Sequence, residues 1–274
     1  MLNPKLELGQ AITNDELRTI FICGNMGGMR RSKTTNSLVI ISDHTKGLYE
    51  DKWFGDTLHY TGMGKKGDQD INASQNRTLN ESNTNGVDVF LFEVFESNKY
   101  IYRGQVKLSE TPYQEKQKDE DGILRNVWVF PVKVVDNHEV TIEKEIIDNN
   151  YKKKEKKAKR LSDAEIEEKA KESQSTKTSV RTTTSQTYER NAYITEYAKR
   201  RANGICQLCN TPAPFKNRLG EPYLETHHIE WLSKGGADII ENTVALCPNC
   251  HKKMHIVDSI EDREYLKKRI DSYC

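Results

Sequence analysis

The sequence lacks three features that would define its class at once: a long apolar run, a secretory leader and a strongly basic charge. The most apolar stretch, 87–95, contains Asp88 and Glu93, and no run approaches the ~18 residues that span a bilayer. The first residues, Met-Leu-Asn-Pro-Lys-Leu-Glu, lack the basic-then-apolar pattern of a signal peptide. We therefore expect a soluble cytoplasmic protein, in a prokaryotic or phage context, with no membrane partner.

The charge is nearly balanced, with 42 Lys and Arg residues against 41 Asp and Glu residues. Nucleic-acid binders are often strongly basic, so any DNA binding has to come from local patches. Residues 146–190 hold 12 basic and 8 acidic side chains, whereas residues 1–145 hold 18 and 22. Hydrophobic residues make up only 35 % of the chain, which indicates that part of it is solvated linker.

A length of 274 residues favours two domains. In residues 1–145, β-branched and aromatic runs separated by turn residues predict strands and a barrel or sandwich. One helix is expected over Asn14–Phe21, with Asn14 as its N-cap. The strands of residues 1–145 are expected at 38–42, 87–95, 100–108 and 127–135.

Residues 146–190 form the predicted linker, which is charged and rich in Ser and Thr, partly helical and partly disordered.

Within this linker, the block Lys152–Arg160 reads KKKEKKAKR. A solvated linker is the simpler interpretation of such a block, and a phosphate-contacting arm is the alternative.

Residues 191–274 predict a second domain with a different pattern. A helix over Tyr193–Ala202 ends at Asn203-Gly204, which suits a left-handed stop. An extended stretch at 223–232 and a strand over Asn242–Leu246 follow, and then a helix from Pro248, since proline is favoured at the first helical position.

Four of the six cysteines form two C-x-x-C pairs in this domain. Paired C-x-x-C motifs in an intracellular chain indicate a metal site before disulfides. Four thiolates suffice for a tetrahedral, structural Zn²⁺ that ties the small domain together, and four ordinary buried thiols are the weaker alternative. The predicted ligands are Cys206, Cys209, Cys247 and Cys250.

Histidines lie within and just beyond the loop that this zinc would close. His251 and His255 are four residues apart on the last predicted helix and share one face, which alone is a weak metal signal. His227 and His228 are adjacent on an extended stretch, where successive side chains point to opposite sides. If both act on one substrate, a twist or bulge is expected there.

The motifs Glu225-Thr-His-His, Gly235-Gly-Ala-Asp, Asn242, Leu246-Cys-Pro-Asn-Cys-His and His255 together resemble an HNH (ββα-metal) endonuclease, especially that of the McrA-like modification-dependent restriction enzymes. The resemblance implies His228 as general base, Asn242 as a brace for its loop and Glu225 as the group that orients a histidine. It also implies a catalytic divalent metal held by His227, His251 and His255.

Many relatives carry aspartate at the position of His227. An all-histidine set shifts the preferred catalytic ion toward Mn²⁺, Co²⁺ or Ni²⁺ relative to Mg²⁺. The alternative is a zinc module that has lost catalysis.

The stretch from Tyr49 to Gln69, with its Tyr-Thr-Gly-x-Gly core, resembles SRA-like domains. These are β-barrel readers that flip a modified cytosine out of the duplex, where aromatic faces and polar groups read it. The spacing between Tyr49 and Tyr60 differs by a gap from eukaryotic members. The alternative is that these aromatic residues are ordinary barrel core. The implied base-pocket and DNA residues are Tyr49, Asp51, Trp53, Tyr60, Thr61, Gly62 and Gly64.

The expected architecture is α+β with two domains, an N-terminal SRA-like β-barrel and a C-terminal zinc-stapled ββα-metal HNH module. The expected function is a modification-dependent restriction endonuclease whose partner is double-stranded DNA containing modified cytosine. Alternatives are an HNH nuclease cutting unmodified sequence, a non-catalytic reader, and a sensor of phosphorothioate. One HNH module cuts one strand per engagement, so a homodimer on DNA is also expected.

Overall fold

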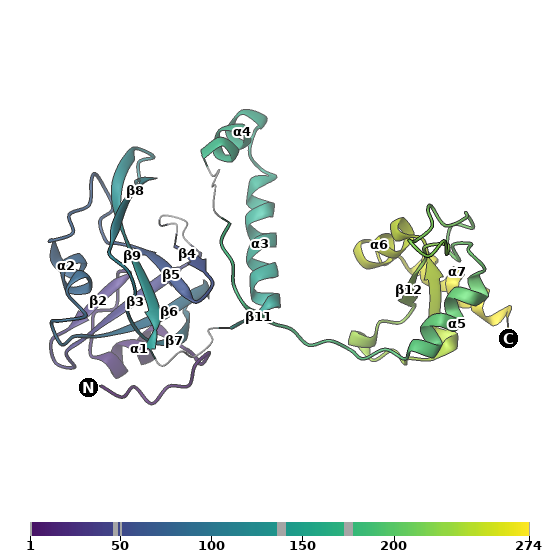
Figure 1. Ribbon diagram of the computed structural model, residues 1–274, viewed down its shortest axis with the longest axis horizontal. Helices are drawn as coiled ribbons and strands as arrows, with labels where there is room; N and C mark the ends of the chain where they lie inside the picture. The colour runs from purple at the N-terminus through teal and green to yellow at the C-terminus, as the bar shows by residue number, and fades with distance from the viewer. Residues whose placement is uncertain (1, 46–48, 50, 136–140, 173–177, 274) are drawn as a thin grey trace. The chain divides into compact units, whose positions relative to one another are not determined.

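Two structural units make up the chain, Met1–Ser185 and Gln186–Cys274, in this computed structural model (Figure 1). It describes residues 2–45, 49, 51–135, 141–172 and 178–273. The predicted Ser/Thr-rich tract spans Ser173–Thr187, and its first five residues, 173–177, lie outside the described residues. None of the described helices combines the length and the apolar character that a bilayer crossing requires.

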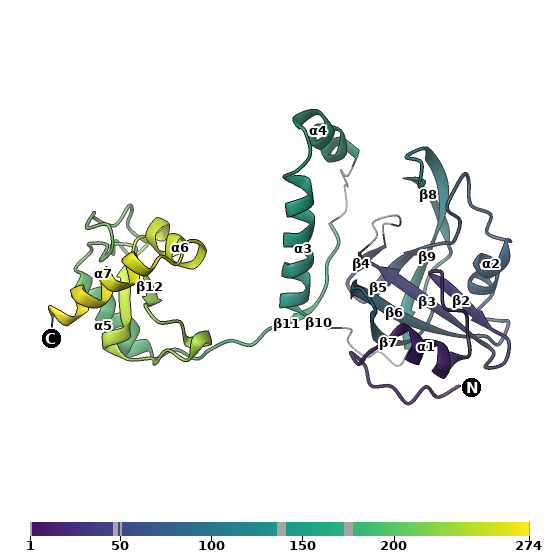
Figure 2. The same cartoon turned by 180° about the vertical axis from the view of Figure 1, so that it is seen from behind.

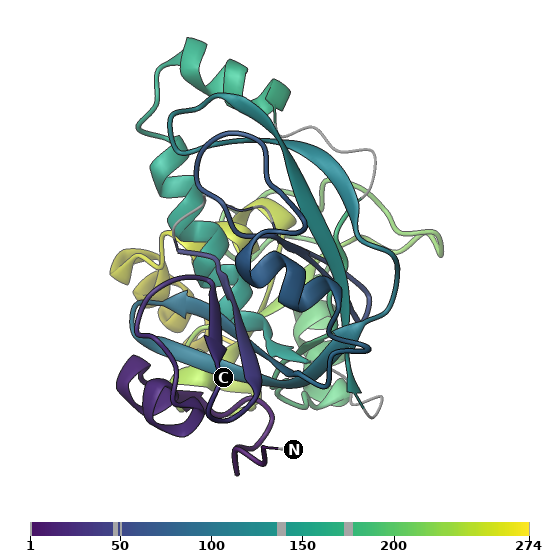
Figure 3. The same cartoon turned by 90° about the vertical axis from the view of Figure 1, so that its left-hand side faces the viewer.

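A nine-stranded mixed sheet organises the first unit, with β8 paired to β9 (teal in Figure 3). The strand order is β2-β3-β6-β7-β9-β5-β4, with β1 on β7 and β8 on β9. The described strands at the two ends of this order, β2 and β4, do not pair with each other, so the predicted closed barrel is wrong. The bounds are β1 Ala11–Ile12, β2 Met29–Ser32, β3 Ser37–Asp43, β4 Lys52–Phe54, β5 Thr57–Thr61, β6 Asp88–Glu96, β7 Lys99–Leu108, β8 Tyr113–Lys118 and β9 Leu124–Val134.

Both faces of the central strands are buried, because side chains alternate between two apolar clusters. In β3, Leu38 and Ile40 enter one cluster while Val39 and Ile41 enter the other. Helix α2 (Ser74–Asn80) covers the first face, and α1 (Asn14–Phe21) covers the second (Figure 2).

The predicted helix range Asn14–Phe21 is confirmed, but its N-cap is Thr13 and not Asn14. The Thr13 hydroxyl accepts from the Glu16 amide, and the Glu16 carboxylate accepts from the Thr13 amide at 2.7 Å. Such a capping box needs a hydroxyl with glutamate three residues later, and only Thr13 meets both conditions.

A fully buried carboxylate, Glu93 on β6, lies inside this unit. It accepts hydrogen bonds from His44 (2.9 Å), Trp53 Nε1 (3.0 Å) and Arg103 Nε (2.7 Å), and two from Arg181 (2.8 and 2.6 Å). Burial alone would raise its pKa, but the His44 hydrogen bond and the charges of Arg181 and Arg103 hold the pKa of Glu93 well below its ordinary value. It is therefore ionised and paired throughout the physiological range.

The predicted linker contains two helices, α3 (Lys144–Ala158) and α4 (Asp163–Glu172), with no buried side chain in α3. Two short strands, β10 (Ile142–Glu143) and β11 (Thr183–Thr184), pair in parallel on either side of them. Residues 178–184 contact the first unit and are not a free linker segment.

The second unit is a two-stranded hairpin surrounded by helices. Helix α5 begins at an Asn191 cap and ends at Asn203 in the left-handed region (φ 46°), as the Asn-Gly pair predicted. Pro248 lies in the first turn of α6. The bounds are α5 Ala192–Ala202, β12 Glu225–His228, β13 Thr243–Leu246, α6 Pro248–Ile256 and α7 Ile260–Asp271.

Replacing the charge of Glu93 provides a test of this core. Glu93→Gln leaves two arginines facing a neutral group, so we expect a loss of about 3–5 kcal/mol in the free energy of unfolding at pH 7. Because the folded pKa lies below the unfolded value of about 4.3, the stabilisation is present above that pH and disappears as the pH falls further. Denaturant titrations from pH 7 to pH 3 should show the difference from wild type narrowing below about pH 4.

The matched control is Glu196→Gln, which removes an exposed i, i+4 partner of Arg200. It should leave stability unchanged, and a Glu93→Gln protein as stable as this control would contradict the role of the buried carboxylate.

Candidate functional site

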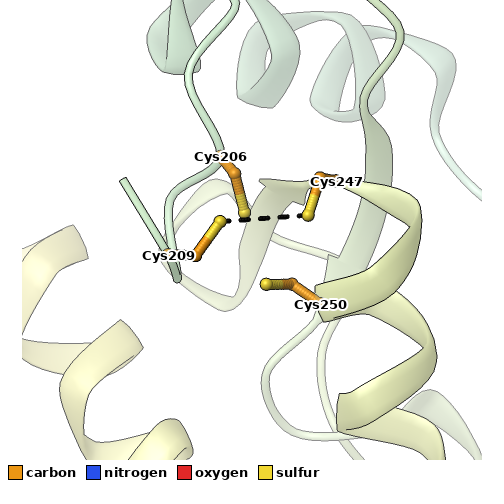
Figure 4. A group of neighbouring side chains, drawn as sticks. All are labelled: Cys206, Cys209, Cys247 and Cys250. Carbon is orange, nitrogen blue, oxygen red and sulfur yellow. Dashed lines mark hydrogen bonds between the residues drawn. The ribbon is translucent and has the colours of Figure 1, made fainter. Parts of the chain in front are cut away.

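The four predicted zinc cysteines come together from two segments of the second unit (Figure 4). Cys206 and Cys209 follow α5, Cys247 caps α6 and Cys250 lies in its first turn. Their sulfur atoms all lie within 4.8 Å of one another. Burial by itself raises the pKa of Cys209, but hydrogen bonds from Thr211 bring it to about 6. Four convergent sulfurs, one favouring the thiolate near neutral pH, fit a tetrahedral Zn²⁺.

A second donor cluster joins β12 to α6. One ring nitrogen of each of His227, His251 and His255 lies within 4.8 Å of the others, and the Nε2 atoms of His251 and His255 are 3.1 Å apart. Buried Nε2 of His227 has no hydrogen-bond partner among the described atoms. An orphaned nitrogen beside two others is the arrangement that a divalent metal satisfies.

The electrostatics of the cluster favour neutral imidazoles, which is the form that binds metal. Burial, followed by the neighbouring His255 and His251, lowers the pKa of His227 to about 3. Burial and the His251 charge likewise lower the pKa of His255. Glu225 forms a hydrogen bond with Nδ1 of His251, which leaves Nε2 of that ring for a ligand.

His228 lies on the other side of the same strand. The β12–β13 ladder runs in regular register from Glu225↔Leu246 to His228↔Thr243, without the bulge that the adjacent histidines suggested. Nε2 of His228 lies 2.9 Å from Asp238 Oδ1, so Nδ1 is the nitrogen left for a substrate. Both His227 and His228 nevertheless line one cavity of about 540 Å³.

Asn242 fixes the loop that connects β12 to β13. Its Oδ1 accepts from the Glu230 amide (2.8 Å), and its Nδ2 donates to the carbonyls of Glu230 (2.9 Å) and Ala237 (2.8 Å). At Gly236 a Cβ atom would lie 2.0 Å from the Glu230 carbonyl oxygen, so only glycine fits this approach. These contacts place Asp238 beside His228.

Asp238 was not among the predicted site residues, although it stands in the Gly-Gly-Ala-Asp motif. Its second oxygen accepts from the Asn191 amide at 2.7 Å, which ties it to the start of α5. The cavity also brings in Arg190 and Trp231, which no sequence signal singled out. Its remaining lining residues are Gln186, Thr187, Tyr188, Thr226, Leu232, Ser233, His251 and His255.

In the first unit, the predicted base-pocket residues gather around Asp51. Its Oδ1 accepts from the Thr61 amide at 2.7 Å. Burial raises the pKa of Asp51 to about 6, against the opposing effects of hydrogen bonds from Thr61 and Ser42. Tyr60 is buried, with its hydroxyl donating to the Gly28 carbonyl, and the Tyr49 hydroxyl donates to the Gly64 carbonyl.

The remaining predicted pocket residues, Trp53, Gly62 and Gly64, have structural roles in the first unit. The Trp53 indole is buried against Glu93 and Arg181. A Cβ on Gly62 would lie 2.9 Å from side-chain atoms of Asn76, Gln69 and Phe130, so close packing explains this glycine, and Gly64 adopts φ +136°.

Gln117 is a further buried polar residue near Asp51, and no sequence motif identified it as a site residue. Gln117 on β8 is buried and donates from Nε2 to the Thr61 hydroxyl at 3.1 Å. Its Oε1 has no hydrogen-bond partner among the described atoms. The residue is 56 positions from Thr61, and the β8–β9 and β5–β9 pairings bring the two together.

A cationic cleft of about 460 Å³ lies between α3 and the loop at His44 and Thr45. None of its five lysine and arginine side chains forms an ion pair with a described carboxylate. They come from the block that the sequence left open between linker and phosphate-contacting arm. They are Lys153, Lys154, Lys156, Lys157 and Arg160.

Comparison with known proteins divides the chain in the same two parts. The family model of ScoMcrA-like SRA domains matches residues 8–150, more than half of the chain, and the HNH endonuclease model matches residues 206–256. The type IV methyl-directed restriction enzyme EcoKMcrA of Escherichia coli K12 is 47 % identical over 68 residues, which are 25 % of this chain and 24 % of that enzyme.

Two solved structures are similar at low identity. The type IV phosphorothioation-dependent restriction endonuclease ScoMcrA is 19 % identical over 98 % of this chain and 63 % of its own, with a TM-score of 0.40. The modification-dependent TagI restriction endonuclease is 19 % identical over 92 % and 79 %, with a TM-score of 0.39. Neither TM-score reaches 0.5, so neither likeness bears on function. The chain spans less than two thirds of the length of EcoKMcrA and of ScoMcrA.

The sulfur cluster makes a direct prediction. Cys206→Ser removes one of four ligands, and structural zinc contributes about 10–16 kcal/mol to folding in small domains, so the second unit should unfold. Metal analysis should find about one zinc per wild-type chain and much less in the variant. Proteolysis of the full chain should then digest residues 186–274 first.

Cys23→Ser is the control, because Cys23 lies alone against the core of the first unit. It should retain zinc. A folded wild-type chain free of zinc would rule out the structural metal.

Proposed function

Because the chain belongs to the ScoMcrA-like SRA family and carries an HNH endonuclease domain, we propose that it is a modification-dependent DNA endonuclease. It reads a modified cytosine with the first unit and hydrolyses phosphodiester bonds with the second. The observation that carries the proposal is the cavity that joins three convergent histidines to the His228–Asp238 pair.

The hydrolytic step needs a base for the attacking water. Asp238 accepts from Nε2–H of His228 and so holds the tautomer whose Nδ1 is free to take the proton. Asn242 keeps the loop closed so that this pair stays aligned. Arg190, at the same cavity, is a cation able to pair with the phosphate.

His227, His251 and His255 would hold the catalytic metal, with Glu225 orienting His251. Once bound, the ion supplies positive charge to the phosphoryl oxygens and to the departing 3′ oxygen. Three nitrogen donors favour Mn²⁺, Co²⁺ or Ni²⁺ over Mg²⁺. The zinc bound by the four cysteines is structural, because all four of its positions are filled by protein sulfur.

The reading step requires a flipped base and an acceptor for the cytosine amino group. Asp51 is the carboxylate in position to accept from that group, and Tyr49 and Tyr60 are the neighbouring aromatic residues. The unpaired Oε1 of Gln117 adds a second acceptor near Thr61. The five unpaired cations of the α3 cleft suit the phosphates that flank the flipped nucleotide.

Matched duplexes that differ only in one mark test the function. We expect cleavage of duplexes carrying 5-methyl- or 5-hydroxymethylcytosine, in Mn²⁺, Co²⁺ or Ni²⁺, and little cleavage of plain DNA. Equal cutting of plain DNA would indicate an ordinary HNH nuclease, and binding without cutting a pure reader. Cleavage that depends on phosphorothioate would assign the mark to the backbone.

Two nuclease units are required for a double-strand break, since each holds one base and one set of metal ligands. A two-fold pair matches the symmetry of the duplex, so we propose that two chains assemble at least transiently on DNA.

His228→Ala separates chemistry from recognition. Loss of the general base should reduce the cleavage rate by at least about 10²–10⁴-fold, while the affinity for modified DNA stays unchanged. Single-turnover cleavage and a filter-binding assay measure the two. His59→Ala, which removes a histidine outside both sites, should cut near the wild-type rate. Near-normal cutting by His228→Ala would disprove its role.

Asp51→Asn separates recognition from stability. The amide cannot accept from the cytosine amino group with its NH₂, so preference for modified DNA should fall by about 10-fold or more. Since the folded pKa of about 6 lies above the unfolded value, ionisation destabilises the wild type above pH 6 and has no effect below about pH 4. The variant should therefore be more stable by about 1–3 kcal/mol at pH 8 and equally stable at pH 4.

Binding assays and denaturation at the two pH values check this pair of effects. Unchanged selectivity would remove Asp51 from the pocket, whatever the stability.

A further inference from the structure

A seven-residue segment before the second unit, residues 178–184, follows the edge of the first unit, and we call it the strap. The Val180 amide donates to the Trp53 carbonyl at 2.9 Å, and the Gly55 amide donates to the Val180 carbonyl at 3.2 Å. Further along, the Ile142 amide donates to the Thr182 carbonyl (3.3 Å), and β11 pairs with β10. The strap thus adds to the edge of β4 and continues into a second short pairing.

Arg181 anchors the strap. Its two terminal nitrogens bind the two oxygens of Glu93, whose side chain is fully buried, while the Arg181 side chain is only 14 % exposed. The guanidinium carbon also lies 4.9 Å from the centre of the Trp53 ring. A bidentate pair with a buried carboxylate, covered by an aromatic ring, is among the firmest polar contacts a side chain makes.

The anchor shortens the connection between the two units. The predicted linker had 45 residues, 146–190, but with the strap bound only residues 185–191 remain between it and α5, and four of these, Gln186, Thr187, Tyr188 and Arg190, line the cavity of the second unit. Seven residues reach at most about 23–25 Å. Release of the strap adds its own seven residues, 178–184, to the connection, and these extend its reach by up to about 23–25 Å more.

The anchor point is also close to the proposed base pocket. Trp53, which contacts the strap through its backbone and its ring, is two residues from Asp51. The strap that leads to the nuclease is therefore anchored beside the group proposed to read the mark.

We propose that the strap sets how far from the modified base the nuclease cuts, with Arg181 as the residue that determines this distance. The proposal rests on the proposed function. At about 3.4 Å per base pair, the short connection spans at most about seven base pairs, and a released strap extends it by up to about seven more. Arg181 touches neither the substrate nor the metal ligands, so it acts on cut position and not on chemistry.

The test uses the full chain with Arg181→Ala on a long duplex carrying a single modified cytosine. Sequencing of the ends produced by nicks and breaks should show a narrow window for wild type and a window broader by up to about seven base pairs for the variant, with total cleavage and affinity retained. Arg200→Ala is the matched control and should keep the wild-type window, because Arg200 is an exposed arginine of α5 whose ion pair among the described residues is with Glu196. Identical windows for Arg181→Ala and wild type would overturn the proposal.

A second variant lengthens the connection while the strap stays bound. Insertion of six Gly/Ser residues after Ser185 should move the outer limit of the window by up to about six base pairs. An unchanged limit would also overturn the proposal.

Two measurements do not depend on cleavage. Hydrogen exchange should show the Val180 amide protected in wild type and in Arg200→Ala, and exposed in Arg181→Ala. Small-angle scattering should show a longer maximum dimension for Arg181→Ala than for wild type. Absent protection in wild type, or superimposable scattering curves, would refute the strap itself. Failure of wild type to cut marked DNA while both results hold would instead refute the proposed function.

Discussion

A carboxylate removed from water has to be neutralised, and Glu93 is neutralised by groups from four separate parts of the chain. Arg103 comes from the adjacent strand, Trp53 from an edge strand, His44 from a loop and Arg181 from beyond two helices. Each cationic partner contributes to the compensation of this charge in a low-dielectric interior, so each segment is held against the others. The position of the edge strand beside Asp51, and the starting point of the connection to the second unit, both follow from this one buried charge.

Within the part of the chain that the structure describes, incomplete hydrogen bonding occurs in both proposed sites, as it does at other buried groups such as Ser82 Oγ and Gln207 Nε2, whereas the Glu93 carboxylate has partners for both oxygens. His227 Nε2 and Gln117 Oε1 are buried and lack partners among the described atoms, and the Asp51 carboxyl has a raised pKa. An unpaired buried polar group normally destabilises a fold. A ligand that supplies the missing partner removes the penalty, which gives each group a physical reason to bind a metal ion or a base.

The nuclease site could be predicted from sequence because its determinants are local. Paired C-x-x-C turns and histidines four residues apart fix donor geometry over a few residues, and the structure brings these donors together. The Asn203 stop and the Pro248 helix start follow from single-residue backbone preferences for the same reason. Asp238 was missed because its role appears only when the Asn242 loop folds it onto His228.

Long-range contacts set the limit of such reasoning. The strands were recognisable by composition. That the described strands β2 and β4 do not pair with each other depends on strand order, which composition does not encode. The predicted N-cap, Asn14, was wrong by one residue, because the hydrogen bonds between Thr13 and Glu16 make Thr13 the N-cap. Residues 178–184 were predicted to be part of a polar linker, because the role of Arg181 depends on its contact with Glu93, which is 88 positions away in the sequence.

Reading and cutting place opposite demands on the connection between the units. A long flexible connection dilutes the nuclease around its mark, whereas a short one raises its effective concentration at nearby phosphates. A short connection also restricts pairing of two nuclease units to chains bound at neighbouring marks. If the break requires two units, the strap then acts twice, on the distance of each cut from its mark and on the spacing of marks that permits a double-strand break. An isolated modified base would then direct a cut in one strand but rarely a break across both, so the density of modification would become part of what permits a double-strand break.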